Sequence, residues 1–514
     1  MNTLAALAAS SYDVLVVGGG ATGAGVAWDA ARRGLRVALV ERGDFGGGTS
    51  STSTKLAHGG VRYLEKAVRS LDLGQLRLVI SALRERAGLL RAAPHLAHAE
   101  ELAIPLRSRW QSLYYGIGLA LYERLAGARS LGRTRRVDAA ALSRLAPALA
   151  TAGYAGGVLF FDGAFDDARF ALELALSAES AGARVRSYTA VEELLREGRR
   201  VVGARVRDVL SGERAELRAT QLVNCTGPWA DALREMARPG IAPRLRPSQG
   251  IHVVLERSWW PGELGLLIPK TPDGRVLFAL PFEGHLLVGT TDTEVRDLRV
   301  PPHASEADIA FVLETFGTAI GRTVPRDAVR AAWAGYRPLV AAKGSRRTEA
   351  LIRDHEVEVW SEEGLLSVLG GKWTTYRAMA EDAVDRLCEL RGERRPCSTS
   401  GATLLRAAEP AALRADPALR ALPADIAAHL VRYGSAAPAL ARAIAAEGSA
   451  RIDPQHPFTR SELRFCVAEE HVRTVDDLLD RRLRIGWVDE RARARLAPSL
   501  APFLPSAPAP APGP

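Results

Sequence analysis

The chain has 514 residues, of which 47% are hydrophobic and 25% charged, a composition typical of soluble globular proteins with two or three domains. The formal net charge of +9 favours acidic partners, such as nucleic acid, anionic lipid or a phosphorylated substrate, without choosing among them. The 4 cysteines show no C-x-x-C spacing, so we expect a reducing compartment and no metal site.

The N-terminal stretch MNTLAALAAS lacks the basic start of a signal peptide. The uncharged run LYYGIGLALY, residues 113–122, is about half of the ~20 residues that span a bilayer. We therefore expect no transmembrane helix.

Residues 12–40 predict a strand, a helix and a second strand, from the stretches YDVLVV, VAWDAARRG and LRVALV. Between the first strand and the helix, Gly18, Gly20 and Gly23 satisfy the G-x-G-x-x-G pattern in the context that gives it meaning. These glycines allow a tight turn, a close approach of backbone amides to a pyrophosphate, and close packing of the helix on the strand. The unit predicts a Rossmann-like nucleotide site.

Glu41 directly follows the second predicted strand. An acid at this place accepts hydrogen bonds from an adenosine ribose and repels a 2'-phosphate. The sequence therefore disfavours NADP as the ligand.

The pattern is helical and rich in arginine from about Ser70 to Ala148. Between Thr151 and Thr226, strand and helix patterns alternate again and end in LVNCTGPWAD. A strand that stops at Thr-Gly-Pro is typical of a Rossmann sheet where a strand end meets its ligand, which makes Gly227 a candidate contact.

The middle of the chain changes to short strand-like runs, such as IHVVLE, VLFALPF and HLLVGT, separated by PDG and EG turns. This pattern predicts antiparallel hairpins, and we interpret them as a substrate domain inserted into the nucleotide-binding domain. Further on, GLLSVLGGKWTTYR runs from a strand through Gly370 and Gly371 into a helix. The amides of this second helix start suit an anion, such as the pyrimidine end of a reduced flavin.

After about Ser398 the pattern is helical to about Leu500, which predicts a C-terminal helical domain over residues 398–500. The tail, residues 501–514, is rich in proline and alanine, and we expect it to be disordered.

An early nucleotide motif and a late glycine–helix motif favour a flavoprotein over a nicotinamide enzyme, because a flavin is held at both ends. The motifs VVGGGATGAG, TSSTSTKLAHGGVRYLE, NCTGPWAD, LVGTTDTE, AGYRPL, LIRDHEVE and GGKWTTYR together resemble the FAD-dependent glycerol-3-phosphate dehydrogenases. The resemblance runs in order from about residue 11 to 390. The later stretch ELRFCVAEEHVRTVDDLLDRRLRIGW resembles the C-terminal helical domain of that family.

The combined prediction is an α/β protein with a Rossmann-like FAD-binding domain, an inserted antiparallel β-sheet substrate domain and a C-terminal all-helical domain. We assign residues 11–395 to the FAD-binding domain with its interleaved cap, whose segments are roughly 70–150 and 240–350.

The resemblance implies oxidation of sn-glycerol 3-phosphate at C2 to dihydroxyacetone phosphate, with the hydride passing to FAD and the electrons to a membrane quinone. A glycerol-3-phosphate oxidase, which passes electrons to O2, stays open as the alternative. A basic flavoprotein that binds RNA is disfavoured because the arginines are spread along the chain and balanced by 59 acidic residues. We therefore expect no nucleic-acid partner, and a homodimer is left open.

The resemblance also implies roles for individual residues. His58 and Arg337 become the catalytic candidates, with His58 the better proton acceptor because arginine stays protonated. Arg62, Tyr63, Arg353 and Lys372 become substrate-binding candidates. The expected cofactor contacts are Gly18, Gly20, Gly23, Glu41, Thr49, Ser50, Ser51, Lys55, Gly227, Gly371 and Thr374.

Two residues depart from the pattern expected of the family. Cys225 stands where we expect alanine, and a small thiol should be tolerated there. Trp373 is bulky inside the glycine–helix motif, where it is expected to change the exposure of the flavin.

A quinone-linked enzyme without a spanning helix must meet the bilayer in the interface plane. Residues 107–129 are the candidate segment, because apolar side chains recur there at helical spacing between arginines. The alternative is an amphipathic helix buried on its own domain. On the membrane interpretation the protein is cytoplasmic and peripheral to the inner face of the cell membrane. The apolar positions are Trp110, Leu113, Tyr114, Ile117, Leu121 and Leu125, and the arginines are Arg107, Arg109, Arg124 and Arg129.

Overall fold

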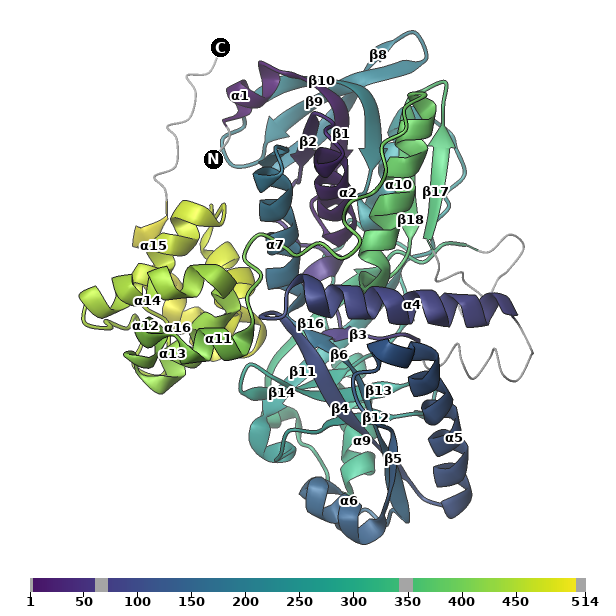
Figure 1. Cartoon of the computed structure of the whole chain (residues 1–514), viewed down its shortest axis with the longest axis vertical. Coiled ribbons are helices and arrows are strands. Elements are labelled where there is room, and N and C mark those ends of the chain that lie inside the picture. The colour runs from purple at the N-terminus through teal and green to yellow at the C-terminus, as the bar shows by residue number, and fades with distance from the viewer. Residues whose placement is uncertain (1–2, 61–72, 342–354, 505–514) are drawn as a thin grey trace.

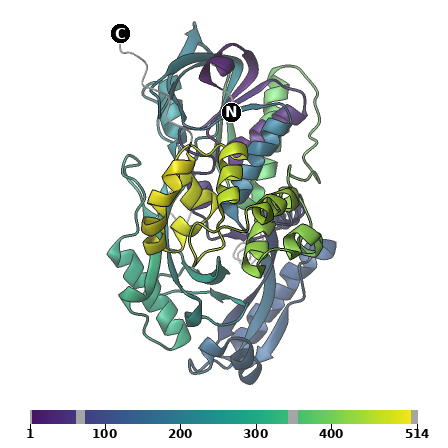
Figure 2. The ribbon, with the colours of Figure 1, turned by 90° about the vertical axis from the view of Figure 1, so that its left-hand side faces the viewer.

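The computed structural model of the chain describes residues 3–60, 73–341 and 355–504. Two β-sheets lie one above the other in Figure 1, with helix α4 (Leu73–Ala92) between them. A cluster of C-terminal helices lies to one side. In Figure 2 these helices face the viewer and cover the junction between the two sheets.

The first sheet has the strand order β17-β18-β10-β1-β2-β7, and the hairpin of β8 and β9 adjoins β10. Neighbours from β18 to β7 are parallel, while β17 is antiparallel at the edge. Strand β2 and residues 14–17 of β1 are apolar and buried, because helices and further strands cover both faces of the sheet there. The strands are β1 (Ser11–Val17), β2 (Val37–Val40), β7 (Arg184–Arg186), β8 (Thr189–Glu197), β9 (Arg200–Asp208), β10 (Arg214–Asn224), β17 (His355–Trp360) and β18 (Leu365–Gly370).

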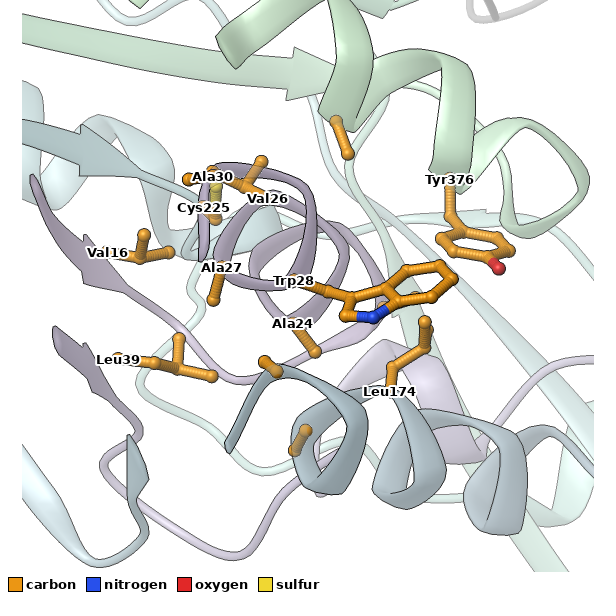
Figure 3. Packing of buried hydrophobic residues seen from close by; sticks show 14 of the residues in the cluster. Val16, Ala24, Val26, Ala27, Trp28, Ala30, Leu39, Leu174, Cys225 and Tyr376 are labelled. Atoms are coloured by element: carbon orange, nitrogen blue, oxygen red, sulfur yellow. The ribbon is translucent and has the colours of Figure 1, made fainter. Parts of the chain in front are cut away.

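Helix α2 (Ala21–Arg32) packs between α7 (Asp167–Ser180) and α10 (Tyr376–Leu390) on one face of this sheet. Its alanines permit the close approach, and Trp28 fills the space between Leu174 and Tyr376 (Figure 3). The strand–helix–strand unit predicted over residues 12–40 is confirmed.

The second sheet follows the order β15-β11-β14-β13-β12-β4-β6-β3, with β16 paired to β11 and β5 to β6. All but one of its pairs are antiparallel; β12 and β4 are parallel. Helices α5 (Arg109–Ala126), α6 (Ala139–Leu145) and α9 (Glu306–Ile320) pack against it. The strands are β3 (Leu56–Ala57), β4 (Ala97–Leu106), β5 (Arg135–Asp138), β6 (Gly156–Phe165), β11 (Ser248–Glu256), β12 (Gly265–Ile268), β13 (Leu277–Phe282), β14 (His285–Gly289), β15 (Thr293–Glu294) and β16 (Val329–Arg337).

The prediction that residues 70–148 are helical is wrong for two strands, β4 and β5. The β4 sequence AHAEELAIPL is rich in alanine, glutamate and leucine, which are good helix formers. Its ten residues pair along their whole length with β6. Tertiary pairing therefore overrides the local propensity.

The C-terminal domain has a hydrophobic core with buried residues such as Leu430, Tyr433 and Leu463, and this core continues onto Val254 and Trp333 of the second sheet. The predicted helical character of this domain, and with it the predicted fold class, is confirmed. No helix among the described residues is both long and apolar enough to cross a bilayer. The helices are α11 (Pro410–Ala415), α12 (Pro417–Arg420), α13 (Ala424–Leu430), α14 (Ala437–Ala446), α15 (Arg460–Glu469) and α16 (Glu490–Leu500), and a π-helical turn spans Asp477–Arg482.

Candidate active site

A cavity of about 1850 Å³ opens at the carboxyl ends of the parallel strands, where Val17, Val40, Cys225 and Gly370 line it. Open α/β sheets bind their ligands at this edge. The volume exceeds the roughly 300–1,000 Å³ of a pocket for a drug-sized ligand. Its size and place therefore suit a dinucleotide.

The glycine motif between β1 and α2 allows close backbone packing. A Cβ on Gly18, whose φ is +106°, would lie 2.5 Å from the carbonyl oxygen of Cys225. A Cβ on Gly23 would overlap the carbonyl oxygen of Gly18. A side chain at Gly23 would push the helix away from the end of β1, and one at Gly18 would clash with the backbone that follows β10, so both positions require glycine for close packing.

Gly20 is the N-cap of α2 and offers no side chain to the helix amides. The Ala21 amide donates to Ser50 Oγ at 2.9 Å, and Gly20 and Ser50 both line the cavity. The positive end of a 12-residue helix therefore faces the cavity, as a pyrophosphate requires.

Glu41 lines the cavity just past the end of β2. Its Oε2 accepts from the Gly19 amide at 2.6 Å and its Oε1 from the Gly43 amide at 2.9 Å. Burial raises the pKa of this carboxyl, and the two amides oppose that rise. Each oxygen keeps a further lone pair that can accept another hydrogen bond. The ribose contact of Glu41 stays a prediction.

The loop after β2 is tied to the second sheet and to the turn that follows β18. Thr49 Oγ1 donates to the carbonyl oxygen of Tyr336 at 2.6 Å. Trp373 Nε1 donates to the carbonyl oxygen of Ser50 at 2.8 Å, and the indole packs edge-on against Phe165. Thr49, Ser50 and Trp373 all line the cavity. Trp373, which departs from the family pattern, therefore anchors this loop.

Ser51 and Lys55 lie behind the cavity wall. Lys55 is buried, and its Nζ donates to the carbonyl oxygen of Ser51 at 2.6 Å and to both oxygens of Asp167 at 2.7 Å. Burial, and secondarily the charge of Arg484, lower the pKa of Lys55 to about 8, although Asp167 opposes the shift. The structure therefore gives both residues a part in holding the loop rather than a place in the cavity wall.

The second glycine–helix motif lines the same cavity as the first. Gly227, Gly371 and Lys372 line the cavity, the two glycines with φ of +58° and +85°. Thr374 is buried, and its Oγ1 donates to the carbonyl oxygen of His58 at 3.3 Å. This bond joins the early and late motifs.

Arg337 ends β16 and lies across the neighbouring strand β11. Its Nη2 donates to Thr290 Oγ1 at 2.9 Å and to the carbonyl oxygen of Thr291 at 3.0 Å, and Nη1 lies 3.3 Å from Asp292. A Cβ on Gly250 would overlap the guanidinium. The glycine therefore makes room for Arg337.

His252, which the sequence analysis did not single out, lies two residues past Gly250 on β11. The side chain is buried, with Nε2 3.0 Å from Thr54 Oγ1 and the ring stacked on Trp333 at 4.3 Å. Burial, followed by the charges of Lys55 and Arg337, keeps the pKa of His252 well below its ordinary value. The histidine is therefore neutral at pH 7. An imidazole inside the apolar strand IHVVLE was the available signal.

Of the remaining residues predicted for the substrate site, only His58 lies among the described residues. His58 is half-buried at the end of the loop that begins at Thr49. Arg62, Tyr63 and Arg353 lie outside the described residues, and their roles stay predictions.

Comparison with known protein families identifies the class of protein to which this chain belongs. Residues 13–377 match the sequence model of the family described as FAD dependent oxidoreductase. Residues 366–506 match that of the C-terminal domain of alpha-glycerophosphate oxidase. Together with the cavity, these matches identify an FAD-dependent oxidoreductase, and FAD is the cofactor. The residues present fit it, since the glycine cradle, the open helix start and Glu41 lie along one cavity.

The mitochondrial glycerol-3-phosphate dehydrogenase SDP6 of Arabidopsis thaliana is 40% identical over 98% of this chain and 84% of its own. The human mitochondrial glycerol-3-phosphate dehydrogenase is 38% identical over 96% of this chain and 70% of its own. The structure also resembles that of the glycerol-3-phosphate dehydrogenase of Bacillus halodurans complexed with FAD, with a TM-score of 0.77, 27% identity and coverage of 96% and 92%. The chain belongs to the FAD-dependent glycerol-3-phosphate dehydrogenase family.

Proposed function

We propose that the chain oxidises sn-glycerol 3-phosphate at C2 to dihydroxyacetone phosphate and passes the electrons to a membrane quinone. The observation that carries the proposal is the similarity to glycerol-3-phosphate dehydrogenases over 96–98% of the chain. Bound FAD supplies the acceptor for the hydride that leaves C2. The protein has to orient the substrate, hold its phosphate and accept the hydroxyl proton.

Arginine suits the phosphate group because its planar fork binds two oxygens at once through charge-assisted hydrogen bonds. Arg337 is the described candidate, and its bonds to Thr290 and Thr291 fix the guanidinium plane. We assign Lys372, Arg62, Tyr63 and Arg353 to the same substrate site. Asp292, at 3.3 Å from Arg337, orients the guanidinium further.

The proton of the C2 hydroxyl needs a base that is neutral at the working pH. His58 keeps this role in our proposal, because it is half-buried on the loop that leads from the cofactor cavity. His252 is a second candidate because it lies two residues from Gly250, against which Arg337 packs, although it does not line the cavity and its lowered pKa makes it a poorer proton acceptor than an ordinary histidine. His58→Asn and His252→Asn separate the two: the residue that accepts the proton should slow flavin reduction more than it weakens substrate binding.

The quinone acceptor requires access to the membrane, and helix α5 at the outer edge of the second sheet is the proposed contact (Figure 1). The exposed fractions of its Trp110, Ile117 and Tyr114 side chains are 80%, 63% and 47%. Its opposite face, including Leu119 and Tyr122, is buried. The helix therefore has one apolar face in the core and a second that faces outward, which argues against the buried-helix alternative for most of the segment.

Arginines lie at both ends of the outward apolar face of α5. Arg107 and Arg109 lie at the start of the helix and Arg124 and Arg129 near its end, all exposed. An apolar face flanked by arginines suits the boundary of an anionic bilayer. Leu125 is an exception among the predicted contact residues, because it packs inward beside Tyr122 and Leu83. We propose that the protein is cytoplasmic and binds the inner face of the cell membrane in this way.

Anaerobic mixing tests the substrate. Glycerol 3-phosphate should bleach the flavin absorbance near its visible maximum, whereas glycerol at the same concentration should not. Equal bleaching by glycerol would remove the phosphate-binding role from Arg337. Arg337→Met should abolish most of the discrimination while leaving FAD bound.

The alternative acceptor is O2, as in an oxidase. The C-terminal domain match carries the name of an oxidase, so the domain architecture does not favour either acceptor. Stopped-flow mixing of the reduced enzyme with O2 or with a short-chain quinone separates them. Rapid peroxide formation with slow quinone reduction would overturn the quinone proposal.

A further inference from the structure

The loop that carries Glu41 is held from outside its own domain. Asp44 lies three residues past Glu41, and its carboxylate is fully buried between two arginines of the C-terminal domain. Oδ2 accepts from Arg481 Nε and from Arg482 Nη1, and Oδ1 accepts from Arg482 Nη2 at 3.0 Å. Residues about 437 positions apart in the chain thus share one ion-pair cluster.

A second connection reaches the same loop through Tyr188, at the turn between β7 and β8. Its amide donates to the carbonyl oxygen of Gly43 at 2.8 Å, and its hydroxyl donates to Asp477 Oδ1 at 2.6 Å. Arg481 Nη2 donates to the same Asp477 oxygen at 2.9 Å. The connection therefore runs from the cofactor loop through Tyr188 and Asp477 back to Arg481.

The C-terminal domain also forms part of the cavity wall. Thr474, Asp476, Asp480 and Arg481 line the same cavity as Glu41. Three of these residues lie in or next to the π-helical turn Asp477–Arg482, a rare geometry that is frequent at functional sites. The wall beside the nucleotide loop is therefore shared by two domains.

The carboxyl group of Asp44 is ionised in this cluster, like the two guanidinium groups. Burial tends to raise the pKa of Asp44, but the guanidinium groups of Arg482 and Arg481 outweigh it and hold that pKa below its ordinary value. Buried ion pairs are weak evidence for stability, because desolvation offsets the attraction, but they fix one geometry where an apolar contact would allow several. A cluster at this place fixes the position of the Glu41 loop relative to the C-terminal domain.

We propose that the C-terminal helical domain is a cofactor-retention element, in which Arg481 and Arg482 position the Glu41 loop through Asp44 and thereby slow the release of FAD. The proposal rests on FAD occupying the cavity that Glu41 lines. Asp44, Arg481 and Arg482 act in it as positioning residues for the loop, and Asp44 and Arg481 also line the cavity.

The test compares FAD release from purified holoenzyme variants at a temperature well below unfolding, followed by the recovery of flavin fluorescence on dilution. Asp44→Asn should speed FAD release at least tenfold. Tyr188→Phe removes only the hydroxyl and should speed release two- to fivefold. The matched control is Glu283→Gln, which breaks the 2.8 Å ion pair with Arg432 between the same C-terminal domain and the second sheet, and it should leave release unchanged.

Equal effects of Asp44→Asn and Glu283→Gln would overturn the proposal, because the cluster would then serve domain docking alone. Unchanged release in Tyr188→Phe together with an unfolded Asp44→Asn would overturn it as well. Failure of the function proposed above looks different: glycerol 3-phosphate would then fail to bleach the flavin of the unmodified protein, whatever the release rates of the variants.

Discussion

The two outer elements of this molecule, the C-terminal domain and helix α5, invert the usual distribution of polarity. Where the C-terminal domain meets α7, charged side chains are buried, including Arg169 and Glu470, both fully inaccessible to solvent. On α5, by contrast, large apolar side chains such as Trp110 face outward. The difference indicates two kinds of contact: a permanent internal interface that needs one fixed geometry, and an apolar face available to a partner outside the chain.

The largest expected effect comes from breaking the internal interface. Arg169 binds both oxygens of Glu470, at 2.7 and 2.8 Å, so Arg169→Met leaves a buried carboxylate with fewer partners. We expect the free energy of unfolding to fall by about 3–5 kcal/mol, measured by urea denaturation at saturating FAD. Arg464→Met, which breaks an ion pair with exposed fractions of 58% and 39%, should cost less than about 1 kcal/mol. Similar losses of unfolding free energy in Arg169→Met and Arg464→Met would mean that the buried ion pair contributes no more to stability than the exposed one.

Substitutions on the inward face of α5 should lower the free energy of unfolding nearly as much as Arg169→Met. Leu119 has 1% exposure and packs with Leu102, Ile104 and Phe160 of the second sheet. Leu119→Ala should therefore lower the free energy of unfolding by about 2–5 kcal/mol, because it removes apolar contacts and leaves a cavity. A loss below about 1 kcal/mol in the same urea assay would show that α5 is only loosely attached to the sheet.

Glu173 gives the internal interface a pH dependence. Burial raises the pKa of its carboxyl to about 7, with Arg406 and Arg169 opposing and Glu470 adding to the rise. The folded state therefore keeps a proton between pH 4.5 and 7 that the unfolded state releases, so stability falls as pH rises through this window and levels off above it. Glu173→Gln removes that fall, and its stability relative to the unmodified protein should increase by up to about 3 kcal/mol between pH 4 and pH 8. If the difference in unfolding free energy between Glu173→Gln and the unmodified protein stayed constant from pH 4 to pH 8, Glu173 would not be the group responsible for the pH dependence.

The same contrast explains what the sequence could predict. Gly18, Gly20, Gly23 and Glu41 were predictable because strand, turn and helix lie within about thirty residues and each position has a local physical requirement. Asp44 was not, because its partners stand more than 430 residues away and nothing local distinguishes it from an ordinary loop acid.

Other misses have the same cause. The position of His252 in an apolar strand was a weak local signal, and only strand pairing places it beside Trp333 and Thr54. The resemblance implied that Lys55 contacts the cofactor, but its burial against Asp167 depends on α7, over 100 residues later. Strand β4 was hidden by helix-forming residues. Local patterns thus predict the elements and the nucleotide cradle, whereas side-chain partners depend on the tertiary pairing.

The smallest effect on stability should come from substitutions on the outward face of α5. These substitutions contrast most strongly with those at the C-terminal interface. Replacing Trp110, Tyr114 and Ile117 with serine changes side chains that are 80%, 47% and 63% exposed, so each change should alter the free energy of unfolding by no more than about 0.5 kcal/mol. If this face binds the bilayer, the triple variant should no longer sediment with anionic liposomes, because the apolar area that enters the interface is lost.

The same variant should reduce a membrane quinone slowly while its flavin is still bleached by glycerol 3-phosphate at the unmodified rate. Arg109→Gln with Arg124→Gln provides the matched control for the charge contribution, since it should weaken binding to anionic vesicles and leave the weaker binding to neutral vesicles unchanged. Sedimentation of the triple variant at the unmodified level would place the membrane contact on another surface. A large loss of stability would instead show that the apolar side chains support the fold, and the contrast with the C-terminal interface would then disappear.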